Sequence, residues 1–159
     1  MKILGIDPGY QLLGWSVIDS NFKLLDFGII HTETALPIQE RLFIIHKGLS
    51  EIISLYKPQS AAFERIFFSR NTKTAMNVAY SIGTIMLTLR MEGLEFSEYT
   101  PIQVKKSVTG FGRASKEQVR EMIMRLFNLK EISGPDDAVD AIAIAACHSM
   151  NWKGNIRGK

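Results

Sequence analysis

One acidic residue closes an apolar stretch and another lies inside one, where their neighbours are expected to be buried. Asp7 closes the short apolar run 2–6, and Glu64 lies inside the run 61–67, which is otherwise mostly apolar. A buried charge costs several kcal/mol unless another group compensates it. Two carboxylates that converge also raise each other's pKa. A divalent cation between them would remove both penalties.

A second acidic pair lies near the C-terminus. Asp137 and Asp140 are three residues apart in a helical pattern, so they share one face, and Ala141 and Ile144 on that face are apolar. Carboxylate oxygens suit Mg²⁺ or Mn²⁺. Two such ions about 3.5–4 Å apart are suited to phosphodiester hydrolysis. Histidines and the single cysteine do not show the spacing of zinc ligands, so a zinc site is rejected.

Each acid also has a purely structural interpretation. Asp7 precedes Pro8-Gly9 and suits a turn, and Glu64 could pair with a nearby arginine. Asp136 and Asp137 suit the first turn of a helix, whose dipole favours negative charge. We adopt that interpretation for Asp136 alone. Asp140 lies beyond the first turn, among alanines, and has the weakest structural explanation.

Basic residues concentrate in one segment. Residues 101–130 contain seven basic and two acidic residues, a net charge of +5, whereas the whole chain has a net charge of +3. This excess suits a phosphate backbone, although a solvated helix face would also explain it. Lys105 and Lys116 are candidates for neutralising negative charge during phosphate hydrolysis, and ordinary surface lysines are the alternative. The other candidate DNA contacts in the segment are Lys106 and Arg113.

Aromatic residues follow Glu64. Phe67 and Phe68 run into a polar turn containing Arg70. An exposed aromatic beside a cation can stack on an unpaired base, which we consider for Phe67 with Arg70. Packing in the core is the alternative, and we prefer it for Phe68.

Apolar periodicity and turn residues predict an α/β fold with a mixed five-stranded sheet flanked by helices. The first three strands form an antiparallel meander, and later strands alternate with helices. A capping box from Ser115 to Gln118 opens one of these helices. The predicted strands are 2–6, 12–18, 23–31, 61–67 and 95–99, and the predicted helices are 38–56, 72–91, 101–108, 115–129 and 136–150.

The 159 residues predict one domain over 1–150 and a flexible, basic tail over 151–159. A hydrophobic content of 46% and a charged content of 22% exclude a disordered or fibrous chain. The longest apolar run is far shorter than the roughly 20 residues of a membrane span. The early Asp7 does not fit a signal peptide, and one cysteine forms no internal disulfide. These features predict a cytoplasmic protein without membrane contact.

Taken together, the chain resembles the RuvC-type Holliday-junction resolvases of the ribonuclease-H-like nuclease superfamily. The resemblance covers about residues 3–150. It rests on the order and spacing of four motifs, namely LGIDPG at 4–9, ERIF at 64–67, VKKSVTGFGRASK at 104–116 and DAVDAIAIA at 137–145.

The resemblance implies a homodimer that binds a four-way junction and nicks two strands of like polarity symmetrically, in DNA recombination and repair. It implies Mg²⁺-dependent hydrolysis that leaves 5′-phosphate and 3′-hydroxyl ends, with two Mg²⁺ per active site and Mn²⁺ as a substitute. By motif position, Asp7, Glu64, Asp137 and Asp140 fall on the acidic quartet. Lys105 and Lys116 fall on the functional lysines, Phe67 on the junction-stacking aromatic, and residues 72–91 on the dimer helix.

The chain also departs from the common pattern. It is somewhat shorter than common bacterial members, and Asp136 adds an acid that replaces or supplements a ligand in one interpretation. Phage-type relatives cut other branched DNA as well, so selectivity for four-way junctions, sequence preference and a branch-migration motor partner stay open.

Two other classes of protein share some of these features. An actin-like ATPase shares the turn after the first strand but needs two lobes and a second phosphate loop, which one short domain does not hold. A catalytically silent junction-binding module is the remaining alternative, and the complete acidic quartet argues against it.

Overall fold

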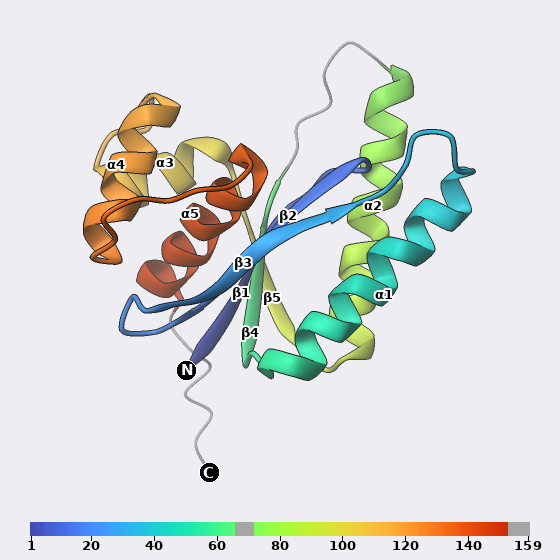
Figure 1. Ribbon diagram of the computed structural model, residues 1–159, viewed down its shortest axis with the longest axis horizontal. Coiled ribbons are helices and arrows are strands. Elements are labelled where there is room, and N and C mark those ends of the chain that lie inside the picture. Colours follow the sequence, from blue (N-terminus) through green and yellow to red (C-terminus); the bar gives the residue numbers. More distant parts are fainter. Residues whose placement is uncertain (66–71, 153–159) are drawn as a thin grey trace.

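The sheet draws its strands from both halves of the chain in the order β3-β2-β1-β4-β5 (Figure 1). β1, β2 and β3 pair antiparallel, whereas β4 pairs parallel with β1 and β5 pairs parallel with β4. The computed structural model describes residues 1–65 and 72–152. The predicted class and the mixed five-stranded sheet are confirmed. The strands are β1 (Lys2–Asp7), β2 (Leu12–Asp19), β3 (Leu24–His31), β4 (Ser60–Glu64) and β5 (Glu95–Tyr99).

Five helices cover the two faces of this sheet, with α1 and α2 on one side and α3, α4 and α5 on the other (Figure 1). The three helices of the second group begin as the sequence indicates. α3 has Pro101 in its first turn, and Ser115 and Gln118 form the predicted capping box of α4. The helices are α1 (Ile38–Tyr56), α2 (Thr72–Met91), α3 (Pro101–Thr109), α4 (Lys116–Leu126) and α5 (Asp136–Asn151).

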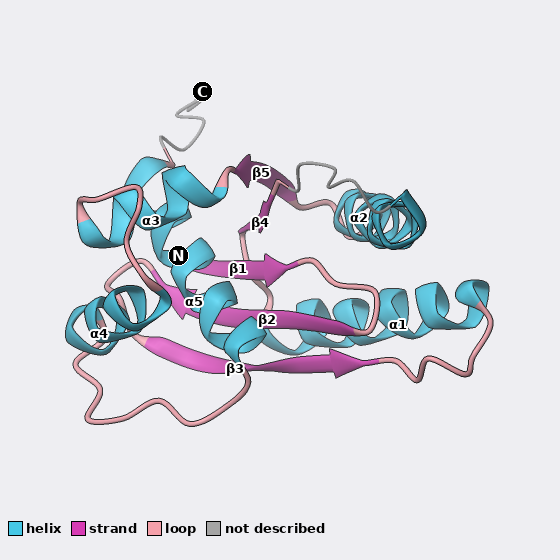
Figure 2. Ribbon diagram, turned by 90° about the horizontal axis from the view of Figure 1, so that it is seen from above, coloured by secondary structure: helices cyan, strands magenta, loops and turns pink. Residues whose placement is uncertain are grey.

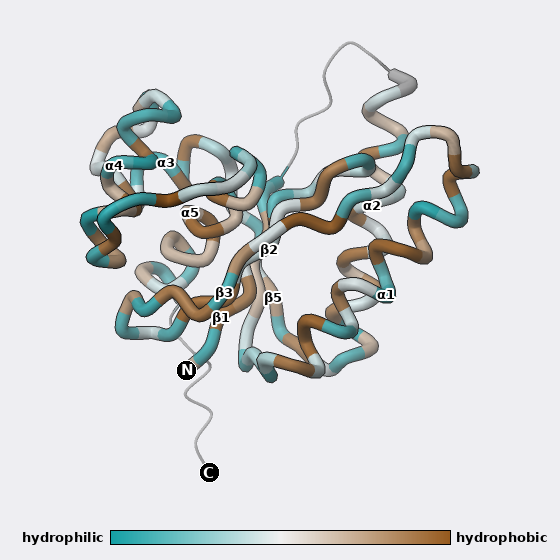
Figure 3. Tube along the Cα trace, viewed as in Figure 1, coloured by the Kyte–Doolittle hydropathy of each residue, from teal (hydrophilic) through white to brown (hydrophobic). Residues whose placement is uncertain are grey.

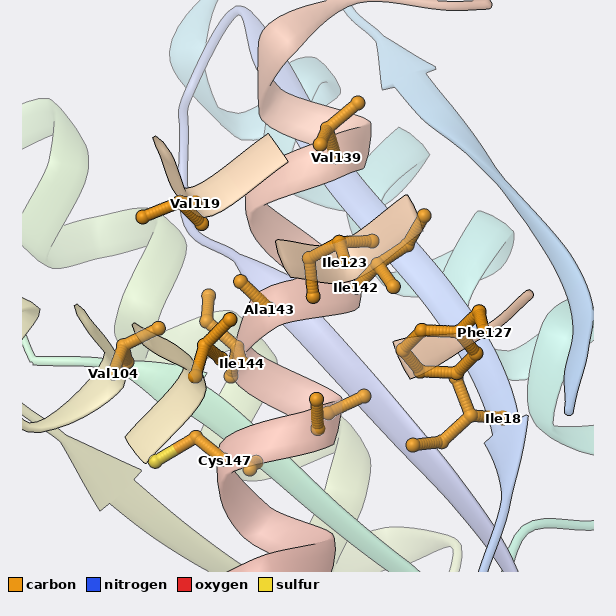
Figure 4. Close-up of a cluster of buried hydrophobic side chains, with 14 of the residues drawn as sticks. Ile18, Val104, Val119, Ile123, Phe127, Val139, Ile142, Ala143, Ile144 and Cys147 are labelled. Atoms are coloured by element: carbon orange, nitrogen blue, oxygen red, sulfur yellow. The ribbon is translucent and has the colours of Figure 1, made fainter. Parts of the chain in front are cut away.

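Alternation along the central strands divides the core into two clusters. Leu4 and Ile6 of β1, with Phe63 of β4, pack beneath α1 and α2. Ile3 of β1 and Ala62 of β4 face the opposite way and pack beneath α3, α4 and α5. Figure 4 shows other side chains of this second cluster. Successive side chains of a strand point to opposite faces, so Asp7 and Glu64 belong to the α5 side.

Small residues allow α5 to lie directly on β1 and β2 (Figure 2). A Cβ at Gly5 would stand 2.8 Å from the Cβ of Ala145, and one at Gly14 would overlap the carbonyl of Asp137. Ser16 of β2 donates a hydrogen bond of 2.9 Å to the carbonyl of Ala141. The N-terminal half of α5, which carries the acidic pair, is thereby held against the end of β1. α5 is largely apolar between its polar ends, as its hydropathy colouring shows (Figure 3).

Two predicted boundaries are corrected. α4 ends at Leu126 rather than 129, because Asn128 adopts a left-handed backbone with φ of 51° that stops the helix. β4 ends at Glu64, and Arg65 lies outside the strand. Phe67 and Arg70 lie outside the described residues. Within the ranges described, no helix is long and apolar enough to cross a membrane.

Candidate active site

Two of the predicted acids come together because their strands are neighbours in the sheet. β1 and β4 run parallel with Ile6 opposite Phe63, which places Asp7 and Glu64 at the same end of adjacent strands. Both side chains are partly buried. The parallel pairing of β1 with β4 therefore joins carboxylates that are 57 positions apart in the chain.

The helix α5 brings the second acidic pair to this end of the sheet. Asp137 lies in its first turn and Asp140 one turn further on, and both are partly exposed. A cleft of about 190 Å³ is lined by the charged residues Glu64, Asp140, Lys105 and Lys116, over an apolar floor from α3, α4 and α5. Three separate helices and one strand thus supply a single mixed-charge cleft.

Around Asp7 the acids outnumber the lysines, because the four carboxylates of Asp7, Glu64, Asp137 and Asp140 stand against Lys105 and Lys116. Burial, together with the charges of Asp140, Glu64 and Asp137, raises the pKa of Asp7 to about 8, against a partial opposing effect of Lys116. Burial raises the pKa of Glu64, and the charge of Asp140 adds to this effect. Burial also raises the pKa of Asp140, although Lys116 opposes it. Near neutral pH, without further positive charge, Asp7 therefore favours its protonated form.

Lys116 is bound between two acids at the start of α4. Its Nζ lies 3.6 Å from Oδ2 of Asp136 and 3.8 Å from Oδ2 of Asp140. The charge of Asp140, more than that of Asp136, raises the pKa of Lys116. Arg120 lies one turn further along α4, and its Nη1 is 3.7 Å from Oδ1 of Asp136. Its Nη2 donates a hydrogen bond of 2.5 Å to the carbonyl of Ile132. Lys116 therefore carries a full charge beside the acids.

Not every predicted contact residue reaches the cleft. Lys105 lines it, but Lys106 on the same helix lines a different hollow with Tyr99 and Asn151. Arg113 is exposed on the loop that precedes α4. Arg120 was missed in the sequence, although its spacing of four residues from Lys116 on a helix is the signal that would have found it. Asp136 does occupy the first turn of α5, and it also pairs with Lys116 and Arg120.

The donor chemistry fits a divalent cation. The converging side chains offer carboxylate oxygen only, and the raised pKa of Asp7 reflects an excess of negative charge that a cation would balance. Across residues 1–65 and 72–152, no three acidic, histidine or cysteine side chains already surround one point closely enough to hold an ion. The fit therefore rests on the type and charge of these ligands.

The sequence as a whole identifies the family. Residues 3–148 match the family model described as crossover junction endodeoxyribonuclease RuvC. The chain belongs to the RuvC family. It is 45% identical over 155 residues to the crossover junction endodeoxyribonuclease RuvC of Caldicellulosiruptor saccharolyticus, covering 95% of this chain and 93% of the relative. It is 42% identical over 158 residues to the RuvC of Halothermothrix orenii, covering 98% and 96%.

Solved structures agree with the RuvC assignment. The structure of Thermus thermophilus RuvC in complex with a Holliday junction substrate matches with a TM-score of 0.88 and 33% identity, over 94% of this chain and 93% of that one. The yeast mitochondrial Holliday junction resolvase Ydc2 matches with a TM-score of 0.69, but at 12% identity it supports the fold alone. The RuvC fold of this chain is thus established over nearly its whole length.

Proposed function

We propose that this chain resolves four-way DNA junctions by hydrolysing two strands of like polarity, leaving 5′-phosphate and 3′-hydroxyl ends. RuvC membership makes it a crossover junction endodeoxyribonuclease that acts in DNA recombination and repair. The observation that carries the chemistry is the surplus of carboxylates around Asp7, whose pKa is raised to about 8. Such a surplus destabilises the charged forms of the carboxylates, and divalent cations would balance it.

In this proposal Asp7, Glu64, Asp137 and Asp140 hold two Mg²⁺, and Mn²⁺ substitutes because it prefers the same oxygen donors. Family membership implies a divalent metal in general terms. When bound, the ions supply a water of lowered pKa and a counter-charge for the leaving oxygen. The four carboxylates would hold the ions from different directions, because they come from two strands and one helix.

The cations of α3 and α4 have a separate role. Lys105 and Lys116 line the cleft with Glu64 and Asp140, so their charges lie where a phosphate would acquire negative charge. Lys106 and Arg113 are exposed outside the cleft and suit contacts to the DNA backbone further along. This division separates residues that affect cleavage from residues that affect binding.

A homodimer completes the proposal. Four of the five large apolar side chains known to be exposed in the described part of α2 have spacings that place them along one side of the helix. Single exposed apolar residues are ordinary, but a row of them on one helix is typical of a protein interface. Two copies related by a two-fold axis would present two clefts to one junction. The four residues are Met76, Tyr80, Leu87 and Met91.

The proposed substrate class is tested by a cleavage panel with synthetic four-way, three-way, flapped and linear duplex DNA, each with Mg²⁺ or Mn²⁺. We expect the four-way junction to give the highest initial rate and paired, symmetric nicks. Equal rates on flapped DNA would contradict selectivity for junctions. Binding without metal-dependent cleavage would favour a catalytically silent junction-binding module.

The Asp7→Asn variant tests the site itself. Loss of a direct metal ligand is expected to lower the cleavage rate by more than about a hundredfold, since even indirect supports of a metal site contribute 10- to 100-fold. Binding to the four-way junction should persist, because no DNA-contacting charge is removed. Single-turnover cleavage and gel-shift titration measure both. Glu51→Gln, at an exposed acid of α1 on the opposite side of the sheet, is the matched control. Near-normal cleavage by Asp7→Asn would contradict the assignment.

A further inference from the structure

An exposed aromatic ring lies between the two helices that supply the lysines of the cleft. Phe111 is 60% exposed, and Ile102 on α3 is 64% exposed. The loop that carries Phe111 leaves α3 after Thr109 and leads into α4 at Lys116. Large apolar side chains held in solvent call for an explanation when they stand together beside a functional site.

Hydrogen bonds fix the backbone at Phe111. The hydroxyl of Thr109 accepts a hydrogen bond of 3.1 Å from the N–H of Phe111 and donates one of 2.8 Å to the carbonyl of Lys105. The carbonyl of Phe111 accepts a hydrogen bond of 3.2 Å from the N–H of Ala114, a buried residue. The aromatic position is therefore tied at both its N–H and its carbonyl.

Two glycines shape this loop. Gly110 caps α3 in the left-handed region with φ of 80°, which favours glycine. At Gly112 a Cβ would stand 2.8 Å from Cγ2 of Ile102, so the loop backbone packs on that side chain. Ile102 therefore supports the loop from below, and the ring of Phe111 is kept on the outside rather than folded into the core.

The charge around this ring selects its partner. Residues 101–115 contain three basic residues, Lys105, Lys106 and Arg113, and no acidic residue. This local charge favours a polyanion that also offers flat apolar faces. Nucleic acid has both properties, because its phosphates meet the cations and its bases and sugars meet the aromatic ring.

We infer that Phe111 packs against a nucleotide of the bound DNA beside the cleft, as a contact that does not depend on sequence. The inference rests on the proposed function, since the DNA is the junction that the cleft would cut. Phe111 binds rather than catalyses: its ring fixes the position of the strand while Lys105 and Lys116 face the phosphate.

The test compares binding of a labelled four-way junction by wild type, Phe111→Ala and Phe111→Trp, in EDTA so that the DNA stays intact. We expect Phe111→Ala to raise Kd about tenfold, in the range of one lost stacking contact, and Phe111→Trp to restore binding. Added junction should also quench the new indole fluorescence of Phe111→Trp relative to wild type. The melting temperature of Phe111→Ala should equal that of wild type, since the ring is exposed.

The matched control is Phe43→Ala, because Phe43 is 61% exposed on α1, across the sheet from this loop. Its Kd should not change. Salt gives a second readout: Arg113→Ala is expected to lower the slope of log Kd against log salt by about 1, whereas Phe111→Ala leaves the slope unchanged.

Two results would overturn the inference. Equal Kd for wild type and Phe111→Ala would mean that the ring does not touch DNA, while the proposed function stands. If Phe111→Ala converts the protein from dimer to monomer, the ring packs against the second copy of the chain rather than against DNA. If the wild-type chain itself does not bind branched DNA, the proposed function fails and this inference fails with it.

Discussion

The ammonium group of Lys116 forms ion pairs with two carboxylates, Asp136 and Asp140, which have different roles. Asp140 lies in the cleft and is a proposed metal ligand, whereas Asp136 lies outside the cleft and is fixed by Arg120. Lys116 and Asp136 are each 65% exposed, so their ion pair contributes little to folding stability. A metal that engages Asp140 would leave Asp136 as the anion that keeps Lys116 in place.

Asp136→Asn is therefore expected to slow cleavage rather than weaken binding. A pair this exposed is worth up to about 1 kcal/mol, which corresponds to about a fivefold lower single-turnover rate at saturating junction. Asp136→Glu should restore the rate, and neither variant should change the melting temperature. Glu121→Gln, at an exposed acid of α4, is the control. A raised Kd with an unchanged rate would mean that Asp136 acts in binding and does not position Lys116.

At the scale of elements, the position of α5 decides where two of the four acids lie. The helix approaches β2 so closely that a Cβ at Gly14 would overlap the carbonyl of Asp137. Both partners of this contact are backbone, which cannot move aside as a flexible side chain can. Any side chain at Gly14 must therefore push the start of α5 away from the sheet.

Gly14→Ala is expected to destabilise the fold by about 1–3 kcal/mol, as overpacking does. Cleavage should fall further than stability suggests, because a displacement of about 1 Å at reacting groups can cost about a hundredfold in rate. Urea unfolding and single-turnover cleavage of the folded protein measure the two effects. Gly48→Ala is the control, since the nearest atoms to its Cβ all belong to the side chain of Ile30, with Cδ1 at 2.8 Å, and none is backbone. Normal cleavage by a folded Gly14→Ala protein would contradict this role of α5.

Local signals predict the elements well and the site only in part. The capping box at Ser115 and the apolar period of α1 and α2 are properties of neighbouring residues, so the sequence locates these helices to within a residue at their starts. The grouping of Asp7 with Glu64 was foreseen from burial. The ion pair of Arg120 with Asp136 was not, because it depends on how α4 and α5 pack. The end of α4 was missed because a left-handed Asn128 has no strong local signal.

The far end of α5 carries a buried histidine. His148 is fully buried, with Nε2 hydrogen-bonded to Oγ of Ser60 at 2.6 Å and Nδ1 to the hydroxyl of Tyr99 at 3.0 Å. Burial lowers the pKa of His148 to about 4. In the unfolded chain a histidine titrates near its ordinary value of about 6.5. Between these values the unfolded chain binds a proton that the folded chain does not, so stability falls as pH falls.

We expect wild type to lose its advantage over His148→Gln as pH falls from about 7 to 5. Well above pH 6.5, His148 is neutral in both the folded and the unfolded chain and contributes no pH dependence. The free energy of unfolding in urea, measured for both proteins at pH 7, 6 and 5, provides the comparison. The shared carboxylates cancel in the difference between the two proteins. A difference that does not change with pH would mean that His148 titrates alike in the folded and unfolded chains.

At the scale of the whole molecule, one cleft per chain matches only half of the proposed reaction. Symmetric nicking of two strands needs two clefts in a fixed relation, and a two-fold dimer supplies this relation. The exposed apolar row on α2 lies on the opposite side of the sheet from α3, α4 and α5, so pairing through α2 leaves both clefts open to DNA (Figure 1).

A charge within this row should separate the two copies without harming the fold. Leu87 is 61% exposed on α2, so Leu87→Glu is expected to shift the protein from dimer to monomer in sedimentation equilibrium while its melting temperature reports an intact core. A monomer nicks one strand at a time, so a cruciform plasmid should accumulate the nicked form before any linear form. Leu55→Glu, at a 71% exposed leucine of α1, should remain dimeric and produce linear DNA directly. If Leu87→Glu stays dimeric, or if it still cuts both strands together, the interface does not lie on α2. The reason is that a glutamate buried in a two-fold contact would face the same glutamate of the second copy, and two like charges without water between them would separate the copies.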